Sequence, residues 1–390
     1  MLHVLYLVHD VSDPAVRRRI IMLKAGGAQV TLAGFRRTAS PIADVEGLQP
    51  IDLGATRDGR FGQRLAAVTK AAVSIVSKLG SMPRPDLIIA RNLEMLALAR
   101  RARSAFQATV PIVYECLDIH RLVLRDDFLG KAMRGAERYL ARDVKLLVTS
   151  SPAFIANYFK PFGQIAAPVE LLENKYFEPA AVLLDDRTVV EDPVAPPWRI
   201  GWFGALRCRR SLELLAEFSR RLEGRFEIIL RGRPALSEFP DFHGFVESEP
   251  WLSFGGPYRN PEDMATIYRE VHFSWAIDFF EQGLNSEWLL PNRLYEGCRF
   301  GAVPISMGNT ETGRFLDRQG IGVLLPKATP EALEAALGDM EQHRFGKLRA
   351  CVLARNPRTW SHDRSDCRAL VEKLRGLTAV PGPYAAEALA

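Results

Sequence analysis

The sequence lacks the features that mark disulfide-rich, metal-binding or membrane-spanning proteins. Its 390 residues include five cysteines, an odd number, which are widely scattered and form no CxxC pair or Cys/His cluster. This pattern indicates neither a disulfide framework nor a metal site. The chain has no run of about 18 or more apolar residues, so no transmembrane helix is expected. A reducing cytoplasm suits such a chain best.

The first residues do not have the pattern of a secretory leader. Residues 1–8 are mostly apolar but have neither a basic leader nor a small-residue cleavage site, so we expect a first strand there rather than a signal peptide. A chain of 390 residues is too long for one ordinary core, and two domains of roughly 150–200 residues are expected. Hydrophobic residues make up 47% and charged residues 25% of the chain, as in average globular proteins.

The net charge of +5 is unevenly distributed. Residues 1–190 hold 26 Lys and Arg against 19 Asp and Glu, whereas residues 191–390 hold 25 against 27. The excess in the first half includes Arg134, Arg138 and Arg142 at helical spacing. Such an excess can attract an anionic membrane or a diphosphate-bearing acceptor, and an ordinary solvated surface is the alternative. Nucleic acid is not an expected partner, because no binding motif accompanies the charge.

Both halves of the chain alternate apolar strands with helices. In the first half, Ser12, Asp13 and Pro14 form a helix start, because a capping side chain precedes a proline. From residue 199 a second α/β series begins, after a Pro-rich passage at 179–198 that reads as a linker. Continuous apolar strands of this kind indicate parallel sheets covered on both faces. The expected strands are 2–9, 29–35, 87–90, 110–115, 146–149, 169–172, 200–203, 226–230, 252–254, 273–277, 303–306 and 323–325.

Three loops of the second half could bind a nucleotide diphosphate. Gly204 lies between a strand and a helix, where backbone N–H groups can approach a phosphate, and Arg207 and Arg210 could neutralise a diphosphate leaving group. Arg231 follows the next strand, and Gly256 and Tyr258 follow the one after it. The alternatives are an ordinary structural turn at Gly204, a loop with exposed arginines at Arg231, and a tight turn at Gly256 and Tyr258.

A helix near residue 296 carries the strongest single signal. Asn292 lies near its start and Glu296 is its one acidic residue, which could accept hydrogen bonds from both hydroxyls of a ribose. A buried glutamate that only stabilises the helix is the alternative. Glu311 opens the next helix, whose polar start also follows a strand.

The segments 289–297 and 301–306, together with the opening at 10–19, resemble the GT-B glycosyltransferases, in particular family 4 and bacterial exopolysaccharide-assembly transferases. The resemblance implies an α/β protein with two Rossmann-like domains whose parallel sheets face a central cleft, and a C-terminal helix that crosses back to the first domain. It implies an acceptor domain at 1–190, a donor domain at 191–358, a crossover helix at 359–376 and a flexible tail at 377–390. The chain departs from the family where Trp288 replaces the first of two donor glutamates and Ala205 replaces an arginine.

The acceptor side is expected at strand ends of the first half. Glu115, Asp118 and His120 end a strand and enter a loop, and a carboxylate or imidazole there could take the proton of an acceptor hydroxyl. The alternative is that Asp118 caps the next helix and His120 is a surface residue. The resemblance implies that His9 and Asp10 contact the acceptor.

These observations predict a hexosyltransferase that moves sugar from a nucleoside diphosphate sugar to an acceptor hydroxyl. The acceptor is expected to be a lipid-linked oligosaccharide of bacterial exopolysaccharide or cell-surface polysaccharide synthesis, at the cytoplasmic face of the membrane. Neither a metal nor another cofactor is expected. A sugar-nucleotide epimerase and a non-catalytic two-lobed sugar or nucleotide binder remain alternatives. A dinucleotide-dependent oxidoreductase is disfavoured, because no GxGxxG follows the first strand.

Overall fold

The computed structural model describes residues 1–56, 61–106, 110–178 and 196–378. Its chain forms two compact units. The first unit comprises residues 1–150 and 155–172 and the described residues from 363 onward; the second comprises residues 151–154 and 173–362. Most of the predicted linker at 179–198 and of the predicted tail at 377–390 lies outside the described residues.

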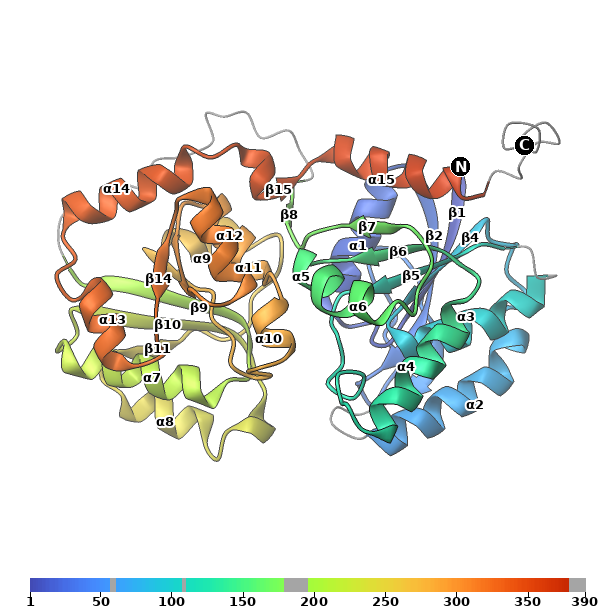
Figure 1. Ribbon diagram of the computed structural model, residues 1–390, viewed down its shortest axis with the longest axis horizontal. Coiled ribbons are helices and arrows are strands. Elements are labelled where there is room, and N and C mark those ends of the chain that lie inside the picture. The colour runs from blue at the N-terminus through green and yellow to red at the C-terminus, as the bar shows by residue number, and fades with distance from the viewer. Residues whose placement is uncertain (57–60, 107–109, 179–195, 379–390) are drawn as a thin grey trace. The chain divides into compact units, whose positions relative to one another are not determined.

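The first unit is built on a seven-stranded parallel sheet in the order β3-β2-β1-β4-β5-β6-β7. Figure 1 shows α2, α3 and α4 on one side of this sheet and α1 with α15 on the other. Its elements are β1 (Leu2–Val8), α1 (Pro14–Ala25), β2 (Ala28–Arg36), β3 (Ile51–Ala55), α2 (Phe61–Leu79), β4 (Leu87–Arg91), α3 (Leu93–Arg103), β5 (Ile112–Cys116), α4 (Phe128–Ala141), β6 (Val144–Thr149), the π-helix η2 (Ile155–Phe159), α6 (Lys160–Phe162), β7 (Val169–Leu171) and α15 (Arg364–Gly376).

Local sequence explains how this unit begins and how its last helix attaches. Every residue of β1 is buried, as expected of a central parallel strand covered on both faces. The Asp13 side chain accepts a hydrogen bond from the Ala15 N–H at 2.8 Å and caps α1. At the other end of α1, a Cβ on Gly26 would lie 2.3 Å from the Cys367 carbonyl oxygen. Glycine therefore lets the backbone of α15 approach α1 closely.

The second unit has a six-stranded parallel sheet in the order β11-β10-β9-β12-β13-β14. Figure 1 shows α7 and α8 on one side of it and α9, α11 and α12 on the other. Its elements are α5 (Pro152–Phe154), β8 (Tyr176–Phe177), β9 (Trp198–Leu206), α7 (Arg209–Arg221), β10 (Phe226–Pro234), α8 (Phe242–Ser248), β11 (Leu252–Phe254), α9 (Met264–Arg269), β12 (Phe273–Trp275), α10 (Asn285–Trp288), α11 (Asn292–Arg299), β13 (Val303–Met307), α12 (Glu311–Gln319), β14 (Val323–Leu325), α13 (Pro330–Leu337), α14 (Gln342–Leu353) and β15 (Ser361–His362).

These two parallel sheets confirm the predicted α/β fold with two Rossmann-like domains. The return of the last helix is also confirmed, since α15 belongs to the first unit and packs on α1. The central cleft and the boundaries at 190 and 358 stay predictions. Within the described chain the two units divide at residues 150, 154, 172 and 362. The strands β8 and β15, which follow and precede the last two of these positions, pair with each other in the second unit.

Candidate active site

Three glycines line the carboxyl ends of neighbouring strands in the second unit. Gly204 in β9 pairs with Gly232 in β10, and the Gly232 N–H donates to the Gly256 carbonyl at 2.9 Å. All three have positive φ, at 108°, 130° and 74°, a region that favours glycine. A Cβ on Gly232 would lie only 1.9 Å from the Gly204 oxygen. The backbone edge therefore carries no Cβ atom at these three positions, which suits close approach of a phosphate.

Glu296 lies next to this edge, on the first helix turns of α11. Its side chain is buried, with 3% of the residue exposed. The Asn260 amide donates to Oε1 at 2.8 Å and the Tyr268 hydroxyl donates to Oε2 at 3.5 Å. Burial, followed by the charge of Glu296, raises the pKa of Tyr258, whose hydroxyl would lie 3.9 Å from a Cβ on Gly204. The structure therefore brings Gly204, Tyr258 and Glu296 together.

A second cluster collects positive charge on the loop after β12. Arg207 pairs with Asp278 at 3.0 Å, and its guanidinium lies over the Phe280 ring. Arg210 donates to Gln282 at 2.5 Å and lies over the Phe279 ring. Both predicted phosphate ligands thus contact one loop, which holds their side chains at the end of β9.

Arg293 is a buried cation that the sequence interpretation missed. It donates to the Ile277 carbonyl at 2.8 Å. Burial lowers its pKa, and the charge of Asp278 opposes that shift. Burial would raise the pKa of Asp278, but Arg207 and Arg293 outweigh burial and the net shift is downward. The carboxylate of Asp278 therefore holds two arginines near the strand end. Its position was the available signal, because Arg293 directly follows Asn292, a predicted donor residue. Asn292 itself is half-buried at the start of α11.

Two other predicted donor residues, Arg231 and Glu311, each pair with charged side chains outside these two clusters. Arg231 pairs with Glu270 at 2.9 Å and packs against Gly255. Glu311, at the start of α12, accepts hydrogen bonds from Arg314 and Arg318, each at 3.0 Å. Both oxygens of Glu311 are thus engaged by arginines of its own helix, and its contact with the donor stays a prediction.

In the first unit, Glu115 is the centre of a buried charge network. It is 1% exposed, accepts from Arg19 at 2.6 Å and Tyr6 at 2.5 Å, and pairs with Arg91 at 3.2 Å. Burial would raise the pKa of Glu115, but Arg19, Arg91 and the Tyr6 hydroxyl lower it overall. An ionised carboxylate with two guanidiniums is a poor proton acceptor, so this geometry favours a structural role over a catalytic one.

The other two predicted catalytic residues, Asp118 and His120, are exposed after β5. The Leu122 N–H donates to the His120 Nδ1 atom at 3.2 Å, so a neutral ring carries its proton on Nε2. Desolvation lowers the pKa of His120, with Arg64 and Arg121 adding to the shift and Glu94 opposing it. Of the three candidates, Asp118 and His120 have the accessibility that proton transfer needs.

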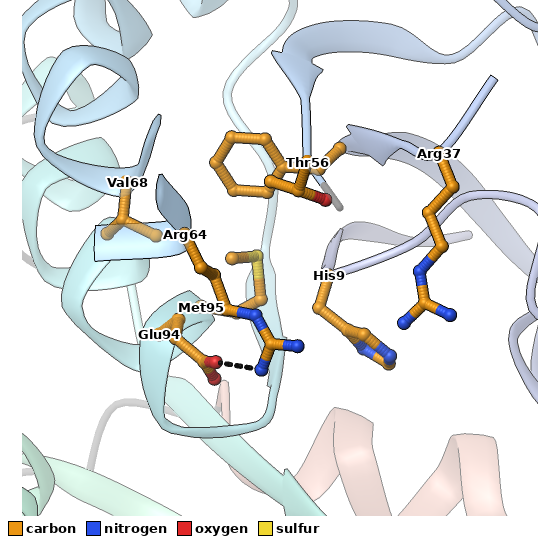
Figure 2. Close-up of a pocket in the computed structure, with 8 residues that line it drawn as sticks. His9, Arg37, Thr56, Arg64, Val68, Glu94 and Met95 are labelled. Atoms are coloured by element: carbon orange, nitrogen blue, oxygen red, sulfur yellow. Dashed lines mark hydrogen bonds and ion pairs between the residues drawn. The ribbon is translucent and has the colours of Figure 1, made fainter. Parts of the chain in front are cut away.

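His9 lines a small, partly open pocket at the carboxyl ends of β1 and β2. Figure 2 shows Arg64 and Glu94 joined on one side of it, with His9 and Arg37 projecting from strand ends on the other. Burial lowers the pKa of His9, and Arg91 and Arg37 add to this while Asp13 and Glu94 oppose it. Asp10 is buried and pairs with Arg37 at 3.0 Å. The full lining is His9, Phe35, Arg37, Thr56, Arg64, Val68, Glu94 and Met95.

Two features of the described residues bear on partners. Among the described residues, no three His, Cys, Asp or Glu side chains gather as ligands of a metal ion would. No helix in the described ranges combines the length and the apolar character needed to cross a membrane.

Comparison with known proteins identifies the family. The chain is 58% identical over 381 residues to the succinoglycan biosynthesis protein ExoL of Rhizobium meliloti (strain 1021), covering 97% of this chain and 94% of ExoL. The chain belongs to the ExoL family. No family model matches it. The predicted resemblance to exopolysaccharide-assembly transferases is thereby confirmed.

Solved structures support the same fold for this ExoL family member. Sucrose-phosphate synthase from Thermosynechococcus elongatus superimposes with a TM-score of 0.70 at 14% identity, over 96% of this chain and 98% of that one. HepE from Anabaena, solved in complex with UDP-glucose, gives 0.66 at 13% identity, over 96% and 100%. Family and fold together make the protein a glycosyltransferase of polysaccharide synthesis, as the sequence predicted.

Proposed function

We propose that this ExoL family member transfers a sugar from a nucleoside diphosphate sugar to a hydroxyl of a lipid-linked saccharide, at the cytoplasmic face of the membrane. The observation that carries the proposal is the Glu296 carboxylate beside Tyr258 and the glycine-lined edge of the second unit. A carboxylate can accept about four hydrogen bonds, and we propose that Glu296 accepts hydrogen bonds from a ribose diol. That HepE was solved with UDP-glucose supports this class of donor.

The donor side would stabilise the leaving diphosphate. As the acceptor oxygen bonds to the anomeric carbon, the bond from that carbon to the diphosphate oxygen breaks and negative charge grows on the nucleotide. We propose that the N–H groups at the glycine edge, with Arg207, Arg210 and Arg293, offset this charge without a metal. The acceptor hydroxyl loses its proton in the same reaction, and Asp118 is the exposed carboxylate we propose to receive it.

The pocket at His9 is proposed to bind the acceptor. It combines the cations Arg37 and Arg64 with the apolar side chains of Phe35, Val68 and Met95. Guanidinium groups recognise phosphate through charge-assisted hydrogen bonds. A saccharide attached to a diphosphate therefore fits the chemistry of this pocket better than a neutral sugar does.

Arg64→Gln tests the acceptor pocket. Arg64 pairs with Glu94 at 3.0 Å, so the variant removes one cation and leaves a neighbouring carboxylate uncompensated. We expect the KM for a diphosphate-bearing acceptor to rise by roughly tenfold or more, since a charged hydrogen bond contributes about 1.5–3 kcal/mol. The KM for the donor should stay unchanged. Lys70→Gln, an exposed change on the same helix, is the control, and an unaltered acceptor KM in Arg64→Gln would argue against this pocket.

The transfer reaction itself tests the proposed function. The protein is incubated with a set of nucleoside diphosphate sugars and a lipid-linked saccharide fraction. The masses of the products are then measured by mass spectrometry. We expect an acceptor heavier by one hexose, with one nucleoside diphosphate released for each transfer. Release of nucleotide with an unchanged acceptor would favour an epimerase, and binding without turnover would favour a non-catalytic binder.

A further inference from the structure

Helix α4 of the first unit exposes an unusual amount of apolar surface. Phe128 is 87% exposed, Tyr139 59% and Leu129 43%. Single exposed apolar residues are common on proteins, but here three large ones lie on one helix of 14 residues. Grouped exposed apolar side chains mark interaction sites.

The exposed face of the same helix carries charge of one sign. Lys131, Arg138 and Arg142 are exposed between and beside the apolar residues. The acidic residue of α4, Glu137, points into the unit, where it accepts hydrogen bonds from Tyr114 at 2.9 Å and Tyr158 at 2.5 Å. All of α4 lies in the described part of the chain, and its outer face holds no carboxylate. The face therefore suits an anionic partner.

Two of the three carboxylates next to the helix, Asp127 and Asp143, pair with arginines. Asp127 pairs with Arg125 and caps α4 through the Gly130 N–H at 3.0 Å, with Asp126 exposed beside it. At the other end, Asp143 pairs with Arg100 at 2.8 Å, with Arg103 at 3.0 Å and with Arg142 of the face itself at 3.6 Å. Positive charge thus remains in excess around the exposed rings.

Two arginines also hold the Tyr139 ring in place. Arg142 lies 4.6 Å from the ring centroid and Arg100 lies 5.3 Å from it. Cation–π contacts of this kind keep an aromatic ring next to guanidinium groups. Tyrosine with nearby cations is typical of the boundary between lipid headgroups and acyl chains.

We propose that this docking face binds the surface of an anionic lipid bilayer. The face consists of Phe128, Leu129, Lys131, Arg138, Tyr139 and Arg142. The axis of α4 lies along the membrane plane, with Phe128 and Leu129 at the acyl boundary and the three cations at lipid phosphates. The inference rests on the proposed function in one respect, because a lipid-linked acceptor would be held in that same bilayer.

Vesicle flotation tests the docking face. We expect the wild-type protein to float with phosphatidylcholine vesicles that contain phosphatidylglycerol, and not with phosphatidylcholine alone. Phe128→Ser with Leu129→Ser should weaken binding by about tenfold or more, from the loss of buried apolar area. Neutralising Lys131, Arg138 and Arg142 to Gln should cost roughly fivefold for each charge at low salt. Val73→Ser on α2, at a residue 78% exposed, is the control and should bind as wild type.

A second probe reports on insertion directly. Brominated lipids should quench the emission that Phe128→Trp adds to that of the wild type. They should not quench the emission that Val73→Trp adds. Binding that is equal in wild type and in the docking-face variants would overturn the inference. So would self-association that Phe128→Ser with Leu129→Ser abolishes in sedimentation velocity, which would assign the face to a second copy.

Transfer to a water-soluble acceptor analogue separates this inference from the proposed function. The docking-face variants should keep wild-type turnover on that analogue while losing vesicle binding. Turnover without vesicle binding in the wild type would contradict the docking face but not the proposed function. Vesicle binding without any turnover would contradict the proposed function but not the docking face.

Discussion

Replacing Glu296 with alanine is expected to lower kcat/KM for the nucleotide sugar by about 100- to 10,000-fold. Two hydrogen bonds from a ribose diol to an ionised carboxylate are each worth about 1.5–3 kcal/mol, and the variant removes both. Free nucleoside diphosphate should lose affinity by a similar factor in isothermal titration, because the ribose is part of the product as well. Steady-state transfer and titration with the diphosphate check the two quantities independently.

Structural damage from this substitution can be distinguished from lost recognition. Glu296→Ala leaves Asn260 and Tyr268 without their carboxylate partner, so we expect a cost of about 1–3 kcal/mol in the free energy of unfolding. Asn260→Ala removes part of the same network but keeps the carboxylate, and should lose much less affinity for nucleotide. Glu270→Ala, at a partly exposed glutamate of the same unit, is the matched control. Wild-type affinity for the diphosphate in Glu296→Ala would contradict the assignment.

Glu115→Ala is expected to destabilise the protein by about 3–5 kcal/mol. The change leaves the buried guanidiniums of Arg19 and Arg91 without their shared counter-ion, and uncompensated buried charge is among the most costly defects in a protein. Urea unfolding monitored by far-UV circular dichroism measures this effect. Asp118→Ala, at an exposed residue, should change the free energy of unfolding by less than about 0.5 kcal/mol while reducing turnover.

The pH dependence of stability checks the same network. The pKa of Glu115 is lower in the folded protein than its ordinary value of 4.5, so the folded state binds this proton less readily than the unfolded state. Its contribution is complete above about pH 4.5 and is lost as the pH falls through the lower folded value. The difference in the free energy of unfolding between wild type and Glu115→Gln should therefore become smaller below pH 4.5. A difference that is constant with pH, or an unfolding free energy unaltered in Glu115→Ala, would contradict a buried ion network.

The sequence was most informative where local rules decide the structure. The cap and proline at Asp13 and Pro14 specify the start of α1, and continuous apolar runs specify the parallel strands. By contrast, β3 (Ile51–Ala55) was not predicted, because it is a partly exposed edge strand with only short apolar content and its pairing with β2 is a long-range contact. Propensity alone cannot detect such a strand.

For the candidate site, residue type and strand position predicted which residues lie near one another, but not which side chains pair. Gly204, Tyr258 and Glu296 come together as the parallel topology requires, since carboxyl ends of parallel strands share one edge. The engagement of Glu115 by Arg19 and Arg91, and of Glu311 by Arg314 and Arg318, depends on side chains that only the folded chain brings within reach. The pairing of Asp278 with Arg207, and the effect of the Arg293 charge on the pKa of Asp278, were missed for the same reason.

The most direct measurement is a crystal structure of the protein with a bound nucleoside diphosphate sugar. The account predicts that the ribose hydroxyls donate to Glu296 and that the diphosphate lies against the backbone of Gly204, with Arg207 or Arg210 within hydrogen-bonding distance. A nucleotide bound elsewhere, with no ribose hydroxyl within hydrogen-bonding distance of Glu296, would contradict it.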